Sequence, residues 1–219
     1  MSKKCFFNYT RRYIMLFCGL SIMAMGIALS IKADIGITPI SSLPYVLNHI
    51  ISNVTIGEFT AAMHISFVLL QIVLLKKEFE VFQLLQLILA VVFGALIDGA
   101  LLLFTHINPS VYHQQFVVFV LSMFFIAFGI FLEVKAGLLL IAGDGAMKAI
   151  STISKIDFGK VKIGFDCSLV LISFVLCLMF THELTGIREG TVLAAIFVGM
   201  ILKVFNEKIH FFDKFVEIN

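Results

Sequence analysis

Three ionisable side chains lie within apolar stretches of the sequence, where a charge is costly. Asp98 lies well inside FGALIDGALLLF, while His64 in TAAMHISFVLLQ and Asp166 in IGFDCSLVLIS lie about one turn inside runs of their own. A charge at the bilayer centre costs about 2.5–3.5 kcal/mol on insertion scales. We therefore expect these residues to face a bundle interior or a cavity and to couple transport to a proton or another ion. A hydrogen bond to a neighbouring helix is the alternative for His64.

Polar residues also mark the starts of two short segments with helical spacing. Thr38 precedes Pro39 after the first apolar run; threonine caps free helix amides, and proline at the first helical position has no amide to leave unpaired. Asp144 is expected to cap a second short helix over residues 146–154. If both helices re-enter the membrane, their N-termini present free N–H groups and positive dipole ends to a solute. The predicted solute-binding residues are Asp34, Thr38, Ser41, Ser42, Asp144 and Thr152.

Alternatives stay open for these segments. Each short helix would lie flat at the membrane interface as an amphipathic connector if it does not re-enter the bilayer. Local pairing of Asp34 with Lys32, and of Glu133 with Lys135, would explain these two carboxylates near the interface without any solute.

The motifs of several enzyme and metal-site classes are absent from the sequence. It contains no GxxxxGK[ST] loop for nucleotide phosphates, no HExxH, no GxSxG and no Cys/His cluster with metal-ligand spacing. We therefore expect a protein that is not an enzyme and that has no cofactor, catalytic residue or metal. The formal net charge of +2 gives no indication of a nucleic-acid partner, because the basic residues lie in the loops between apolar runs.

The composition is that of an integral membrane protein. Hydrophobic residues make up 60% of the chain and charged residues 14%, with a mean hydropathy of +1.07. No polar segment is long enough to fold alone, and six apolar runs have the length of membrane spans. The sequence therefore predicts an all-α, polytopic helical bundle. The expected spans are residues 13–31, 58–75, 81–104, 115–134, 163–181 and 190–205.

The basic residues favour one orientation of these spans. An N-terminus in the cytoplasm leaves only Lys32 and Arg188 on the outer side, out of 16 lysines and arginines. Cytoplasmic loops of membrane proteins carry an excess of lysine and arginine. We therefore expect both termini to lie in the cytoplasm.

A weak internal repeat relates the two halves of the chain. Residues 26–45 (GIALSIKADIGITPISSLPY) return as residues 129–148 (GIFLEVKAGLLLIAGDGAMK), an offset of 103, and a one-residue slip then pairs Gly57 with Gly159. Three spans per repeat would invert the second repeat in the membrane, about a pseudo-twofold axis in the membrane plane. The expected regions are a cytoplasmic N-terminal segment over 1–12, repeat 1 over 13–104, repeat 2 over 115–206 and a cytoplasmic tail over 207–219.

The repeat motifs resemble those of the YczE/YyaS group of bacterial membrane proteins, usually placed beside the YitT proteins. The resemblance rests on residues 32–39 (KADIGITP), 55–57 (TIG) and 190–199 (GTVLAAIFVG). Residues 136–147 (AGLLLIAGDGAM) match the group's pattern in part, but lack its Gly-Pro-Arg before the aspartate. The resemblance covers roughly residues 13–206 and implies a multi-pass protein of the bacterial cytoplasmic membrane, without supplying a substrate.

Together these features predict a small secondary carrier. It would move a small organic solute by alternating access around a site between two inverted repeats, with His64, Asp98 and Asp166 in the coupling role. One alternative is a non-transporting accessory or regulatory membrane subunit. Another is the substrate-capture subunit of an importer whose ATPase is a separate chain. The lipid bilayer is the expected surrounding, and a homodimer or another membrane partner stays open.

Overall fold

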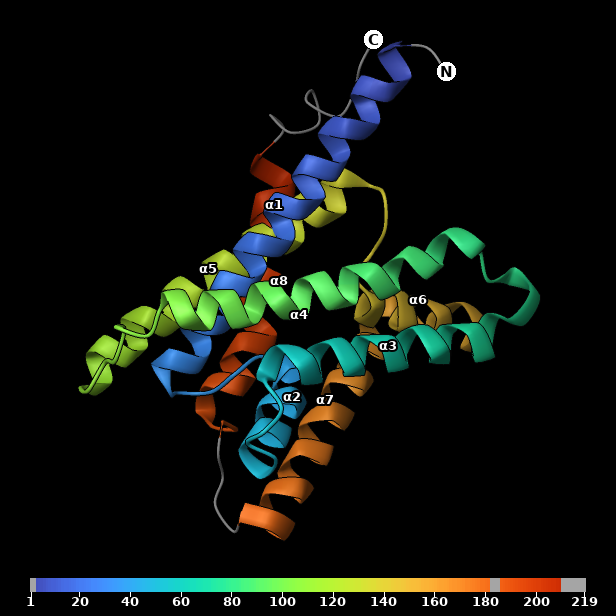
Figure 1. Ribbon diagram of the computed structural model, residues 1–219. Helices are drawn as coiled ribbons and strands as arrows, with labels where there is room; N and C mark the ends of the chain where they lie inside the picture. The colour runs from blue at the N-terminus through green and yellow to red at the C-terminus, as the bar shows by residue number, and fades with distance from the viewer. Residues whose placement is uncertain (1–2, 182–185, 210–219) are drawn as a thin grey trace.

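Helices make up the part of the chain that the computed structural model describes, residues 3–181 and 186–209 (Figure 1). No strand occurs within those residues, so the prediction of an all-α fold is confirmed. Two 3-10 turns, Lys76–Glu78 and Val81–Leu84, join α3 to α4, and a π-helical turn, Cys177–Thr181, follows α7. The α-helices are α1 (Lys3–Ala33), α2 (Pro39–Ile50), α3 (Ile56–Leu75), α4 (Leu85–Leu103), α5 (Tyr112–Ala136), α6 (Ala142–Ser154), α7 (Phe158–Leu176) and α8 (Glu189–Lys208).

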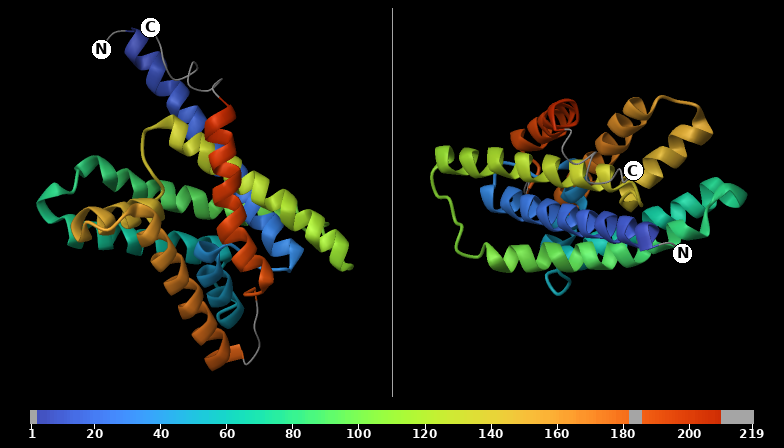
Figure 2. Two further views of the ribbon diagram at one scale, coloured as in Figure 1. Left: turned by 180° about the vertical axis from the view of Figure 1, so that it is seen from behind. Right: turned by 90° about the horizontal axis from the view of Figure 1, so that it is seen from above.

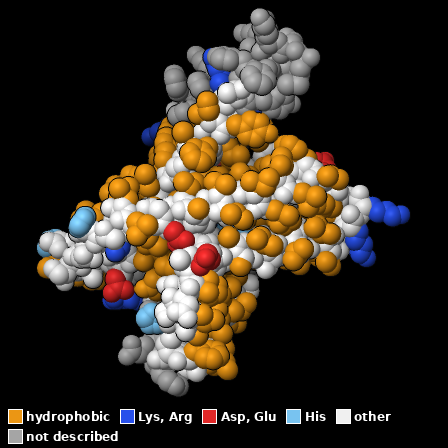
Figure 3. Space-filling view, in the orientation of Figure 1, with side chains coloured by type: hydrophobic (Ala, Val, Ile, Leu, Met, Phe, Trp, Pro, Cys, Tyr) orange, Lys and Arg blue, Asp and Glu red, His pale blue; other side chains and the backbone are white. Residues whose placement is uncertain are grey.

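Six helical segments in these residues are long and apolar enough to cross a membrane, as predicted. Two shorter helices, α2 with 12 residues and α6 with 13, lie where the sequence predicts short helices. Hydrophobic side chains cover most of the face formed by α3 and α4, and basic side chains gather at the end where these helices connect (Figure 3). The chain is therefore a multi-pass membrane protein by the length and composition of its helices. The six segments are Thr10–Ala33, Ile56–Glu78, Val81–Leu103, Tyr112–Ala136, Phe158–Thr181 and Glu189–Lys208.

Side-chain caps set where two of the long helices begin. At the start of α3, the Thr55 hydroxyl accepts the Glu58 N–H at 3.0 Å, and the Glu58 carboxylate accepts the Thr55 N–H at 2.8 Å. At the start of α7, the Asp157 carboxylate accepts the Gly159 N–H at 3.0 Å. These polar residues precede the apolar runs, so hydropathy alone places both helix starts a few residues too late.

The backbone entering α2 repeats in the backbone entering α6. Thr38 and Ile141, which are 103 residues apart, both precede a helix with φ −57° and ψ 146°. Asp34 and Gly137, also 103 apart, both adopt the left-handed region, with φ 53° and 59°. The offset found in the sequence thus reappears as a repeated local conformation.

The predicted capping of these two helices is partly wrong. Thr38 precedes α2 as expected, but its hydroxyl donates to the Ser41 hydroxyl at 3.0 Å and caps no N–H of the helix. Asp144 does not cap a helix over residues 146–154, because it lies in the first turn of α6. The chain enters α6 earlier, at Ile141, because the Glu133 carboxylate accepts the Ile141 N–H.

Helices α1 and α5 run antiparallel and cross with their backbones in contact (Figures 1 and 2). A Cβ added at Gly19 would lie 2.9 Å from the Gly129 carbonyl oxygen, and one added at Gly26 would lie 2.9 Å from the Ser122 carbonyl oxygen. Gly19 and Ser122 are 103 residues apart, as are Gly26 and Gly129. Gly19 of α1 therefore contacts Gly129 of α5 in the same way that Ser122 of α5, the counterpart of Gly19, contacts Gly26 of α1, the counterpart of Gly129.

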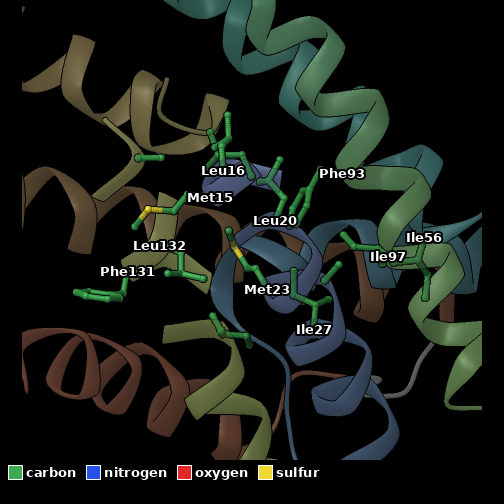
Figure 4. Close-up of a cluster of buried hydrophobic side chains, with 14 residues drawn as sticks. Met15, Leu16, Leu20, Met23, Ile27, Ile56, Phe93, Ile97, Phe131 and Leu132 are labelled. Atoms are coloured by element: carbon green, nitrogen blue, oxygen red, sulfur yellow. The ribbon is translucent and has the colours of Figure 1, made fainter. Parts of the chain in front are cut away.

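A buried apolar cluster surrounds this crossing and draws side chains from four helices (Figure 4). Outside it, α4 packs on α1 and α8 packs on α5, while α3 packs on α6 and α7 packs on α2. The first two pairings are counterparts of each other under the repeat, and so are the last two. The labelled members of the cluster are Met15, Leu16, Leu20, Met23, Ile27, Ile56, Phe93, Ile97, Phe131 and Leu132.

The crossing predicts that Gly129→Ala destabilises the protein. The new Cβ would lie 2.7 Å from the Gly19 carbonyl oxygen and 2.7 Å from the Met23 nitrogen, and such overpacking costs about 1–3 kcal/mol. Gly199→Ala is the matched control, because a Cβ there has no atom within 4 Å and gains the helix propensity of alanine. Size-exclusion chromatography after heating in detergent should show early loss of the Gly129 variant only. Equal heat resistance of both variants would contradict the close crossing.

Candidate functional site

A cavity of about 280 Å³ lies between α3, α4 and α6, beside the connection that joins α3 to α4. Half of its lining residues are polar or charged, and the loop over residues 138–140 forms an apolar wall. Of the nine residues predicted for solute binding and coupling, only Thr152 lines it, in the last turn of α6 and away from the helix start. The polar lining residues are Gln71, Glu78, Glu80, Gln83, Gln86, Lys148 and Thr152.

Gln71 joins the three helices that enclose the cavity. Its buried amide nitrogen on α3 donates to the Gln86 side-chain oxygen of α4 at 2.9 Å and to the Ala142 carbonyl oxygen of α6 at 3.2 Å. Gly145 makes room for the amide, since a Cβ there would lie 2.7 Å from the Gln71 side-chain oxygen. Neither glutamine was among the predicted site residues, although amides inside apolar runs commonly bond between membrane helices.

The contact between α2 and α7 corresponds to this contact between α6 and α3. The hydroxyls of Ser42 on α2 and Ser173 on α7 are hydrogen-bonded at 3.0 Å, and both residues are fully buried. Ser42 precedes Gly145 by 103 residues, and Ser173 follows Gln71 by 102, which is the slipped offset of the sequence. Ser42, a predicted solute-binding residue, therefore lies in the α2–α7 contact, whose counterpart in the repeat is the α3–α6 contact.

At the place that corresponds to the cavity on the other side of the molecule, the described residues pack on one another. Tyr45 on α2 is the counterpart of Lys148, and its ring packs on Gly186, where an added Cβ would lie 2.5 Å from the ring. The Ile37 N–H donates to the Gly186 carbonyl oxygen at 3.2 Å. In the described part of the chain, a side chain and a backbone segment thus occupy one of the two equivalent places, while a cavity lies at the other.

Residues 186–191, which we call the strap, are hydrogen-bonded to the loop between α1 and α2. The Arg188 guanidinium donates to the carbonyl oxygen of Asp34 at 2.8 Å, and the Gly190 N–H donates to that of Ile35 at 3.1 Å. The side chain of Asp34 is exposed, so this predicted solute residue meets the strap through its backbone. The strap thereby joins the start of α8 to the loop between α1 and α2.

The first turns of α2 and α6 touch one another. Ile40 and Gly143 are each the second residue of their helix and lie 103 residues apart; a Cβ added at Gly143 would lie 2.6 Å from the Ile40 Cδ1. Thr38 and Ser41 are buried beside this contact on α2, and Asp144 follows it on α6. The first turn of a helix has N–H groups without helical partners. The structure thus gathers four predicted solute residues, Thr38, Ser41, Ser42 and Asp144, at two facing helix starts.

Asp144 lies close to an ion pair on α7. Asp166 pairs with Lys162 at 3.2 Å, one turn away, and the two side chains are 16% and 47% exposed. Burial raises the pKa of the Asp144 carboxyl above its ordinary value, and the Lys162 ammonium acts in the opposite direction. Asp166, predicted as a coupling residue, is therefore placed at the edge of the α6–α7 contact.

His64 is enclosed by aromatic rings. It is 2% exposed on α3, with its ring edge-on to those of Phe67 and Phe93 at centroid distances of 5.9 and 5.8 Å. Its Nδ1 atom is buried and has no hydrogen-bond partner within the described residues. That atom therefore makes no bond to a neighbouring helix there, which was the alternative to a coupling role.

Asp98 caps the start of α3 from α4. Its carboxylate accepts the Thr55 hydroxyl at 2.6 Å and the Gly57 N–H at 2.8 Å. It faces the bundle, as expected of a carboxylate in an apolar run. In the described part of the chain, no hydrogen bond or ion pair joins Asp98 to His64 or Asp166, and the coupling role of all three stays a prediction.

Glu133 is a buried carboxylate that the predictions did not include in the site. It is 1% exposed on α5, and one of its oxygens accepts the Ile141 N–H that begins α6. The other oxygen has no hydrogen-bond partner among the described residues. The expectation of local pairing with Lys135 missed this role, because the Glu133 side chain points into the bundle.

Comparison with known proteins gives one match. The family model described as a family of unknown function (DUF6198) matches residues 10–207, so the chain belongs to this family. The matched residues include both repeats expected from the sequence. No curated protein and no solved structure matches the chain.

The two aspartates on α4 and α7 predict different costs on removal. Asp98→Ala leaves a helix N–H and a hydroxyl without their acceptor, which should lower stability by about 1–3 kcal/mol. Asp166→Ala breaks a half-exposed ion pair with Lys162, worth about 1 kcal/mol or less. Thermal unfolding of both variants in the same detergent measures the difference. An equal or larger loss in the Asp166 variant would show that the capping role of Asp98 is wrong.

Proposed function

We propose that this member of the DUF6198 family is a secondary carrier of a small solute. Its two repeats would be inverted in the membrane and exchange conformations, so that one central path opens to each side in turn. The charge of the loops supports a cytoplasmic location of both termini and of the cavity mouth. The resemblance to the YczE/YyaS group supports the bacterial cytoplasmic membrane as its location.

The observation that carries this proposal is that the cavity and its counterpart under the repeat are in different states. The cavity between α3, α4 and α6 is open, while among the described residues Tyr45 and the strap pack together at its counterpart. Two half-structures with the same design and different states are what alternating access requires. Exchange of the two states would open the outer place and close the inner cavity.

Contacts between equivalent residues of the two repeats support a pseudo-twofold axis that relates the repeats and passes through the centre of the membrane. Ile40 touches Gly143, and the α1–α5 crossing is centred near Met23. From Met23 to the end of α1 at Ala33 is ten residues, or about 15 Å, which is half the apolar thickness of a bilayer. The five residues 34–38 can return at most about 17 Å toward the centre. This geometry supports helix starts that re-enter the membrane.

The solute path would pass between the two helix starts. Free N–H groups and positive dipole ends favour a polar or anionic group of the solute there. The hydroxyls of Thr38 and Ser41 would contribute from α2 and the Asp144 carboxyl from α6, while the Ser42 hydroxyl bonds Ser173 on α7. Ile40 against Gly143 closes the path in the state described.

The proposal predicts opposite accessibility changes at two engineered cysteines. Thr152→Cys in the cavity should react quickly with a membrane-impermeant maleimide from the cytoplasmic side, and the fully buried Val46→Cys should react slowly from outside. Arg188→Ala removes the bond to Asp34 and should speed the outer reaction while slowing the inner one, because both report one equilibrium. Labelling rates in inside-out and right-side-out vesicles, in a cysteine-free background, measure both.

Lys203→Ala is the matched control, since it removes an exposed positive charge at the other end of α8. It should change neither rate. If Arg188→Ala also leaves both rates unchanged, or raises both together, alternating access is wrong. Copurification of a stoichiometric partner would then favour an accessory subunit or the capture subunit of an importer.

A further inference from the structure

Opposite charges line the cavity without pairing with one another. The Glu78 and Glu80 carboxylates and the Lys148 ammonium are exposed lining groups. The ion pairs found in the described residues lie on α7 and α8, and none of them joins Lys148 to either glutamate. A ligand that carries both charges would satisfy these groups together, which no ligand of one sign can do.

The closed side of the molecule indicates how these charges would move. Tyr45 packs on Gly186 there, and the equivalent residues of the other half are Lys148, at the offset of 103, and Leu84, at the slipped offset of 102. Closing the cavity in the same way would bring Lys148 onto the turn Val81–Leu84, which follows Glu80. Lys148 and Glu80 would then face a bound ligand from opposite sides of the cavity.

Neutral groups form the deeper lining. The amides of Gln71 and Gln86 are hydrogen-bonded to each other, and each amide has both a donor and an acceptor. The apolar wall over residues 138–140 lies beside them. A volume of about 280 Å³ corresponds to about nine water molecules at roughly 30 Å³ each, below the range of drug-sized pockets. The lining therefore fits a ligand with a small, uncharged polar part.

We propose that the cavity binds a small zwitterion of the amino-acid type. The carboxylate of the ligand lies against Lys148, its ammonium against Glu78 and Glu80, and its side chain toward Gln71 and Gln86. A simple cation would leave Lys148 unpaired, and a simple anion would face two carboxylates. This inference rests on the proposed carrier function, because the zwitterion would be the solute that the carrier moves.

Binding to the full-length, detergent-purified protein tests the ligand class. The twenty common L-amino acids are screened by thermal shift at pH 7, since a ligand of the folded state raises its stability. The best ligand is then compared by calorimetry with its methyl ester, which lacks the carboxylate, and its N-acetyl derivative, which lacks the ammonium. We expect each derivative to bind at least about tenfold more weakly, because each loses a charge-assisted hydrogen bond.

Lys148→Gln identifies the side chain that reads the carboxylate. It should weaken the amino acid about tenfold and leave the methyl ester unchanged, so that the preference disappears. Lys160→Gln, which removes an exposed charge outside the cavity, should keep the preference.

Three results would overturn the zwitterion proposal: no amino acid binds, a derivative binds as tightly as its parent, or Lys148→Gln keeps the full preference. None of these touches the labelling rates of the Val46 and Thr152 cysteines, which test the carrier without any ligand. A failed ligand class is therefore distinguishable from a failed transport mechanism.

Discussion

The rest of the structure depends on the contact between α1 and α5. Lipid tails are as apolar as leucine, so helices in a membrane associate through close packing and polar contacts, with little help from the hydrophobic effect. Glycines at the crossing let the two backbones touch, and this contact joins one half of the chain to the other. α4 and α8 pack on the outer sides of the pair, at equivalent places. The remaining helices are placed through these, because α3 packs on α4, and α2 and α6 pack on α3 and on α7.

Two carboxylates at helix starts, one half-buried and one buried, show how polar groups are used in such a bundle. Asp98 accepts the Gly57 N–H at the start of α3, and Glu133 accepts the Ile141 N–H at the start of α6. Each comes from a different helix than the one it caps, so it also fixes the distance between helices. The cost of burying a carboxylate is offset in part by an amide that would otherwise have no partner.

The sequence was sufficient to predict the helices and their order, because spans and short helices leave a hydropathy and proline signal. It also predicted the repeat, whose offset returns in the backbone of Thr38 and Ile141. It could not predict the cavity, since Gln71, Gln86 and Lys148 come together only through the packing of α3, α4 and α6. The prediction that Asp144 caps α6 was wrong, because the carboxylate that binds the start of α6 belongs to Glu133, which lies on α5.

Helix partners that lie far apart in the chain have a consequence for biosynthesis. The Ser42–Ser173 bond joins α2 to a helix 131 residues later. At about 5–20 residues per second, Ser173 is added to the chain roughly 7–26 s after Ser42. During that interval α1, α3 and α4 can assemble, because their contacts lie within the first half. The polar start of α2 would meanwhile remain at the translocon or the bilayer surface. We expect quality-control proteases to recognise an incompletely folded molecule by this short helix without its partner.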